Sequence, residues 1–75
     1  MKDQVLAVRY KGSTSPKRNQ IFQVGKQYTM LLDFFESNLR SRIFVTDKQF
    51  ATVHYSGYID MEREWDVEAK REEEL

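Results

Sequence analysis

The chain contains few side chains that could carry out a reaction. His54 is the only imidazole and cysteine is absent, so an activated nucleophile would have to rely on this one histidine as its base. In the segment 51–55 alternate residues point to opposite faces, which places His54 away from its apolar neighbours. We expect an exposed histidine with no catalytic role, and a protein that is not an enzyme.

Residue types that hold metals and phosphates are equally sparse. A thiolate zinc site needs cysteine, and a single histidine cannot build a transition-metal site. The sequence has no Asp-x-Asp-x-Asp-Gly pattern of a calcium-binding loop. It also has no glycine-rich phosphate loop, because the segment 11–14 contains only one glycine. We therefore expect neither a metal site nor a cofactor.

Charged residues form two groups of opposite sign. Residues 1–48 carry nine Lys and Arg against four Asp and Glu, a net charge of +5. Residues 49–75 carry three against eight, a net charge of −5, so the whole chain is neutral. This balance argues against general polyanion binding by the whole molecule, while each group could still form a local binding surface.

The first candidate binding site is a basic loop. Gly, Ser and Pro interrupt any periodic pattern over residues 11–20, which predicts an irregular segment. Basic side chains there can neutralise phosphates, and a neighbouring tyrosine can stack on a base. The candidate residues for binding nucleic acid or an acidic protein are Arg9, Tyr10, Lys11, Lys17 and Arg18. An ordinary hydrated loop would explain the same composition.

The second candidate is an acidic surface near the end of the chain. Apolar or basic residues alternate with acidic ones over residues 59–68, which predicts a strand with an acidic outer face. The candidate partner-binding residues are Asp60, Glu62, Glu64 and Asp66. This face could occupy a basic groove of a host protein, pair with the chain's own basic half, or support head-to-tail self-association. A helix remains the alternative, because Met61 and Trp65 also have i, i+4 spacing.

Short strands must position both surfaces. The segments 5–10, 42–46 and 51–55 are rich in β-branched and aromatic residues, which favours strands. Residues 21–24 are expected to return to the apolar core, and residues 37–41 to form a hairpin loop. The pattern of residues 26–36 fits a strand and an amphipathic helix about equally, and residues 69–75 favour a short helix or a frayed tail. We expect five aromatic side chains in the core, and three near loops that are more exposed. The core group is Tyr28, Phe34, Phe44, Tyr55 and Trp65, and the loop group is Tyr10, Phe50 and Tyr58.

One set of motifs resembles a known family. Val24-Gly25-Lys26-Gln27-Tyr28, followed by Phe44-Val45-Thr46-Asp47 and later by Tyr55 and Trp65, is similar to a pattern in small phage and prophage proteins. The resemblance implies a mainly β fold, a small five-stranded SH3-like barrel, in which residues 26–36 form a strand. It covers about residues 4–67 and implies a phage or prophage origin and no catalytic residues. The length of the chain predicts one domain, which we place at residues 1–68 with a charged tail at 69–75.

These observations lead to a functional expectation. With no membrane-length apolar run and no signal peptide, we expect a protein of the host cytoplasm. We expect a non-enzymatic, phage-derived accessory protein that contacts a host protein, such as one that handles nucleic acid. The alternative is a nucleic-acid-binding module that uses residues 9–18.

Overall fold

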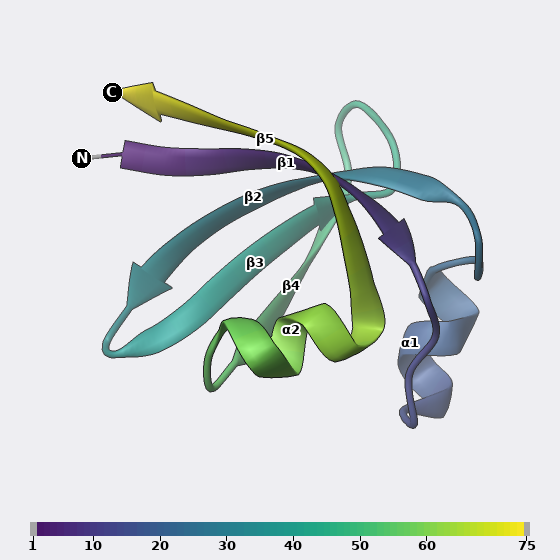
Figure 1. Cartoon of the computed structure of the whole chain (residues 1–75). Helices are drawn as coiled ribbons and strands as arrows, with labels where there is room; N and C mark the ends of the chain where they lie inside the picture. The colour runs from purple at the N-terminus through teal and green to yellow at the C-terminus, as the bar shows by residue number, and fades with distance from the viewer. Residues whose placement is uncertain (1, 75) are drawn as a thin grey trace.

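A computed structural model describes residues 2–74 as five strands and two helices. The strands are β1 (Lys2–Tyr10), β2 (Gln27–Phe35), β3 (Asn38–Phe44), β4 (Phe50–Tyr55) and β5 (Trp65–Glu74). Helix α1 (Pro16–Ile21) lies between β1 and β2, and α2 (Tyr58–Glu64) lies between β4 and β5. Neighbouring strands are antiparallel in one sheet of order β4-β3-β2-β1-β5 (Figure 1). The predicted mainly β fold of five strands is confirmed, including a strand within residues 26–36.

The sheet is strongly curved and encloses the core on its concave side. Figure 1 shows the strands bending over α2, while α1 lies beside the end of β1. Alternate residues of the strands point inward, as the period of two requires. The buried apolar side chains are Leu6, Val8, Tyr10, Phe22, Tyr28, Met30, Leu32, Leu39, Ile43, Val53, Tyr55, Met61 and Trp65. The sheet order ends at β4 and β5, so closure into a barrel stays a prediction.

The last third of the chain differs from the predicted strand and tail. Residues 58–64 form α2, and the strand β5 begins only at Trp65. Met61 is the buried residue of α2. The second half of the helix, residues 61–64, consists of Met, Glu and Arg, which are good helix formers. Residues 69–74, expected as a helix or frayed tail, continue β5 and pair with β1 from Ala69 opposite Ala7 onward. Long-range pairing with β1 therefore prevails over the local helix preference of these residues.

The predicted loop over residues 11–20 contains a short helix. Pro16 stands at the start of α1, where its fixed φ and missing N–H are tolerated, and Ser15 precedes it at the N-cap position. Phe22, directly after the helix, is buried in the core, while Ile21 and Val24 stay exposed. The segment predicted at residues 21–24 thus contributes one side chain to the core.

The turn between β2 and β3 is shorter than predicted. Strand β3 begins at Asn38, opposite Phe35, so only Glu36 and Ser37 connect the two strands. Both residues have positive φ, 50° and 68°, as a two-residue type I′ hairpin requires. The sequence contains no Asn-Gly or Asp-Gly at this turn, which is why a longer loop was expected over residues 37–41.

Neither helix of the described residues is long and apolar enough to cross a membrane. Among residues 4–70, whose side chains the structure describes, no group of three or more His, Cys, Asp or Glu could hold a metal ion.

Candidate functional site

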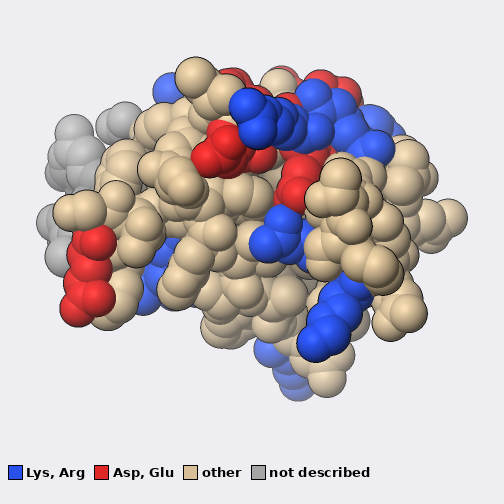
Figure 2. All heavy atoms as spheres, turned by 90° about the horizontal axis from the view of Figure 1, so that it is seen from below, with Lys and Arg blue, Asp and Glu red and all other residues tan. Residues whose placement is uncertain are grey.

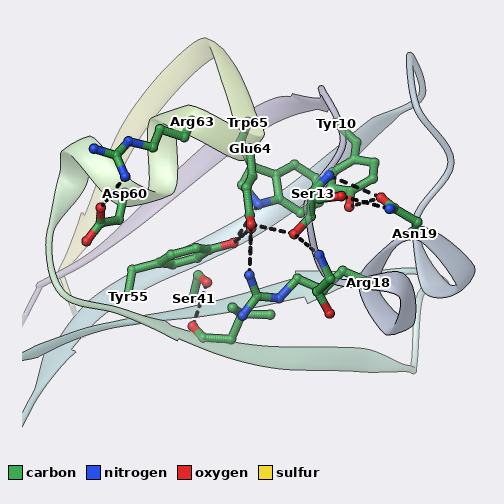
Figure 3. Close-up of polar contacts among 12 residues, drawn as sticks. Tyr10, Ser13, Arg18, Asn19, Ser41, Tyr55, Asp60, Arg63, Glu64 and Trp65 are labelled. Carbon is green, nitrogen blue, oxygen red and sulfur yellow. Dashed lines mark hydrogen bonds and ion pairs between the residues drawn. The ribbon is translucent and has the colours of Figure 1, made fainter.

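Glu64, the last residue of α2, is the centre of a polar cluster that joins three parts of the fold (Figure 3). Its two carboxylate oxygens accept hydrogen bonds from Arg18 Nη1 at 2.8 and 2.9 Å. The hydroxyl groups of Ser13 and Tyr55 donate to the same carboxylate at 2.6 and 2.7 Å. The Glu64 side chain is only 14% exposed, so its charge depends on these donors. We call Glu64, Arg18, Ser13 and Tyr55 the Glu64 latch, because it ties the 11–26 loop and β4 to α2.

The hydroxyl of Tyr55 links the Glu64 latch to the core. It donates to Glu64 and accepts a hydrogen bond from Trp65 Nε1 at 2.9 Å. Burial, followed by the hydrogen bond to the Glu64 carboxylate, raises the pKa of Tyr55 well above its usual range. Tyr55 therefore stays protonated and acts as a fixed donor.

A second set of hydrogen bonds fixes the shape of the 11–26 loop. Asn19 Oδ1 accepts from the Tyr10 hydroxyl at 2.7 Å and from the Ser13 N–H at 3.1 Å. Asn19 Nδ2 donates to the Ser13 carbonyl at 2.8 Å. Gly12 has φ of +109°, which a residue with a side chain rarely adopts. The loop is thus a defined structure rather than an irregular, hydrated segment.

Aromatic rings hold the loop against the sheet. Phe22, from the loop, packs on Tyr10, Tyr28 and Trp65 with ring centroids 5.5, 5.3 and 5.0 Å away. Two of these contacts are edge-to-face, an arrangement that adds stability beyond the buried area.

The structure brings most of the predicted basic residues to acidic partners in the same chain. Arg9 Nε lies 3.1 Å from Glu68, and Arg9 Nη1 donates to the Gly25 carbonyl at 2.6 Å. Lys11 Nζ lies 3.6 Å from Asp66. Arg18 is bound to Glu64, as described above. Lys17 forms none of the ion pairs found among the described side chains and is exposed on α1.

Tyr10 does not have the exposure predicted for it. Its side chain is 1% exposed, packs on Trp65 at 4.8 Å between ring centroids, and donates to Asn19. Burial, followed by the charge of Glu64, raises the pKa of Tyr10. A ring in this position cannot stack on a nucleic-acid base. Tyr10 is buried because β1 extends to this residue, and alternate residues of a strand share a face. Tyr10 therefore points inward with Leu6 and Val8.

The predicted acidic face is also not a single surface. Asp60, Glu62 and Glu64 lie on α2, and Asp66 lies on β5, so the side chains do not follow one strand face. Asp60 pairs with Arg63 at 3.4 Å within the helix, and Glu62 is exposed. Because Glu64, Asp66 and Glu68 pair with the basic half, the two charged groups neutralise each other inside one molecule. These ion pairs correspond to the second of the three interpretations given above, in which the acidic residues pair with the chain's own basic half.

A polar hollow of about 630 Å³ opens beside the Glu64 latch. It is lined by the loop residues 11–14, by Arg18 and Tyr55, and by Asp60, Arg63 and Glu64 of α2. The view from below shows basic and acidic side chains intermixed rather than in separate fields (Figure 2). The hollow therefore has no strong preference for a ligand of one charge.

An exposed apolar surface lies where the end of β2 meets the start of α2. Phe34, Tyr58 and Ile59 are 63%, 41% and 73% exposed, and we call these three residues the apolar patch. The rings of Phe34 and Tyr58 touch edge-to-face with centroids 6.0 Å apart, and the Tyr58 hydroxyl lies 3.3 Å from Gln4. Phe34 was expected in the core because it continues the alternation of Tyr28, Met30 and Leu32. The strand extends beyond the core at this point, which the sequence pattern alone does not reveal.

The other aromatic predictions are mostly confirmed. Tyr28, Tyr55 and Trp65 are buried, while Phe44 is half-buried and stacks on exposed Phe50 at 5.2 Å. His54 is exposed, as expected.

Comparisons with known proteins assign the chain to no family. No family model matches it, and neither a curated protein nor a solved structure matches it significantly. The resemblance to phage SH3-like barrels therefore stays a prediction that rests on the motifs alone.

Proposed function

We propose that this protein is a non-catalytic module that binds another protein, and that the apolar patch forms part of the contact. The observation that carries the proposal is the exposure of Phe34, 63%, whose ring packs on that of exposed Tyr58, with Ile59, 73% exposed, next to Tyr58 in the sequence. Single exposed apolar residues are common on monomers, but grouped ones mark interaction sites. Aromatic side chains are also enriched among the residues that dominate binding energy.

The Glu64 latch supports this function by holding the patch in place. Tyr58 and Ile59 begin the helix that Glu64 ends, and Glu64 is fixed to the loop and to β4. A surface that is already ordered loses less conformational entropy on binding.

The proposed partner is a host protein, and the proposed origin is a phage or prophage. Both proposals rest on the motif resemblance. If the partner is a host protein that handles nucleic acid, the chain itself does not need to contact the nucleic acid. Direct binding through the basic loop gains no support from the geometry, because Arg9, Lys11 and Arg18 are paired and Tyr10 is buried.

Affinity capture with matched variants tests the proposal. The immobilised protein is incubated with a nuclease-treated lysate of the cell that carries its gene, and bound proteins are identified by mass spectrometry. We expect a defined protein that is lost with Ile59→Ser and with Phe34→Ser. Val24→Ser is the control, because Val24 is 62% exposed but lies outside the patch. Equal capture by all variants would contradict a role for the patch.

A retardation assay on labelled DNA and RNA addresses the nucleic-acid alternative. We expect no shift at physiological salt. A shift that weakens steeply with salt and disappears with Lys17→Glu would instead assign the function to the basic loop.

A further inference from the structure

The strand β4 forms one edge of the sheet and lacks the usual protection of an edge. Natural edge strands are blocked by lysine, proline, bulges or covering elements. The six residues of β4 include no lysine, proline or glycine, and their register with β3 is unbroken from Leu39 opposite Tyr55 to Phe44 opposite Phe50. The opposite edge, β5, contains charged residues at most positions and a register shift against β1. Only β4 thus keeps an edge suited to pairing with another strand.

The hydrogen-bond pattern shows which groups of β4 face the open side. The Val45 N–H donates to the Gln49 carbonyl at 3.0 Å, which makes this pair hydrogen-bonded. In an antiparallel ladder bonded and non-bonded pairs alternate, so Ala51 and Val53 direct their backbone groups toward β3. The N–H and C=O groups of Thr52 and His54 therefore point away from the sheet.

A groove runs along this open side. A hollow of about 380 Å³ lies between α1 and β4, and residues 51–54 form one of its walls. Ile21, which is 50% exposed, and the buried Phe22 provide an apolar surface on the other wall. A strand added to β4 would lie between these walls, with alternate side chains directed toward the apolar surface.

The charge of the groove selects the kind of strand. Its lining includes Lys17 and Arg18 and no aspartate or glutamate. Arg18 is bound to Glu64, whereas Lys17 forms none of the ion pairs among the described side chains. This contrasts with the hollow beside the Glu64 latch, where acidic and basic residues are mixed.

From these observations we infer that β4 and α1 bind an extended, acidic segment of a partner protein by strand addition. The backbone of Thr52 and His54 pairs with the segment, an apolar side chain packs on Ile21, and an acidic side chain faces Lys17. This site uses residues outside the apolar patch, so either proposal can fail while the other holds.

Peptide probes of matched sequence test the inference. The acidic probe is a fluorescent decapeptide of alternating Thr and Val in which two central Thr are replaced by Glu. The basic probe has Lys at the same two positions. By fluorescence anisotropy we expect the acidic probe to bind about tenfold more tightly than the basic one at low salt. Equal affinities, or no binding of either probe up to about 1 mM, would overturn the proposal.

Two variants locate the binding. Lys17→Glu should remove or reverse the preference for the acidic probe, because the charge it alters is exposed on α1. Thr52→Pro should weaken both probes, since proline removes an outward N–H and is tolerated on an edge strand. Val24→Ser should change neither result. A preference unchanged by Lys17→Glu would contradict the assignment of the acidic side chain.

Hydrogen exchange provides a readout that does not depend on variants. With the acidic probe bound, the amides of Thr52 and His54 should exchange more slowly, even if Thr52→Pro does not fold. Protection elsewhere and not at β4 would refute the site. A second copy of this chain could occupy the edge of β4 instead, and sedimentation of the free protein tests this. A dimer at high concentration that dissociates with Thr52→Pro would show that a second copy pairs with β4, and would overturn the partner-peptide proposal.

Discussion

At the scale of single residues, the Glu64 carboxylate joins the 11–26 loop and β4 to α2. Three ion pairs among the described residues, Arg9–Glu68, Lys11–Asp66 and Arg63–Asp60, are exposed, and such pairs contribute about 0–1 kcal/mol to stability. The carboxylates of Glu64 and Asp33 are mostly buried, and Glu64 in addition satisfies donors from both the loop and β4. Its loss leaves several donors without an acceptor in a site of low exposure.

We predict that Glu64→Ala lowers the free energy of unfolding by about 2–4 kcal/mol, since the half-buried Arg18 guanidinium and the buried Tyr55 hydroxyl lose their acceptor. Urea denaturation followed by circular dichroism measures the change. Glu62→Ala is the control, because Glu62 is exposed on the same helix, and it should shift stability by less than about 0.5 kcal/mol. Similar effects of the two substitutions would show that the Glu64 latch is not structurally important.

A second residue-scale prediction concerns acid stability. The hydrogen bond from Arg40, together with the charges of Arg40 and Arg42, lowers the pKa of Asp33 from 3.8. A carboxyl group whose pKa is lower in the folded than in the unfolded chain stabilises the fold at any pH above the unfolded pKa. This stability is lost as the pH falls through the folded pKa. Asp33→Asn should therefore be less stable than the wild type at pH 6, and the difference should shrink below about pH 4. Urea midpoints across this pH range test it, and a difference that grows on acidification would contradict it.

At the scale of elements, the sequence predicted the strands better than their connections. Residues 42–46 and 51–55 have enough β-branched and aromatic residues to indicate strands, and alternation correctly turned Val53 inward and His54 outward. The 58–64 helix was only the alternative to a strand, because the alternation of acidic with apolar or basic residues also fits a period of two. The partners of the Glu64 latch could not have been found from sequence, since Ser13, Arg18, Tyr55 and Glu64 meet only through tertiary folding. Nothing in the sequence next to Glu64 indicates that this glutamate is buried.

The hairpin between β2 and β3 yields a prediction at this scale. Glu36 and Ser37 both adopt positive φ, which asparagine and glycine adopt at lower cost. Replacing the pair with Asn-Gly should raise the free energy of unfolding by about 0.5–1 kcal/mol, as measured by urea denaturation. Exchanging Ser56 for Gly serves as a control at a turn with no positive φ, where no stabilisation is expected.

At the scale of the whole molecule, the two oppositely charged halves of the chain pair with each other. The basic residues around the loop face the acidic residues of α2 and β5, and each half screens the other. Two surfaces of the described residues stay uncovered, the apolar patch and the edge of β4. Both are surfaces that suit a protein partner.

Site-specific photo-crosslinking tests the central claim, binding of a protein through the apolar patch, most directly. A photoreactive amino acid is placed at position 59 in the patch or at position 24 outside it, and the protein is irradiated in the cells that carry its gene. We predict that position 59 yields one defined crosslinked protein and that position 24 does not. Crosslinks of equal strength from both positions, or none from position 59, would contradict the account.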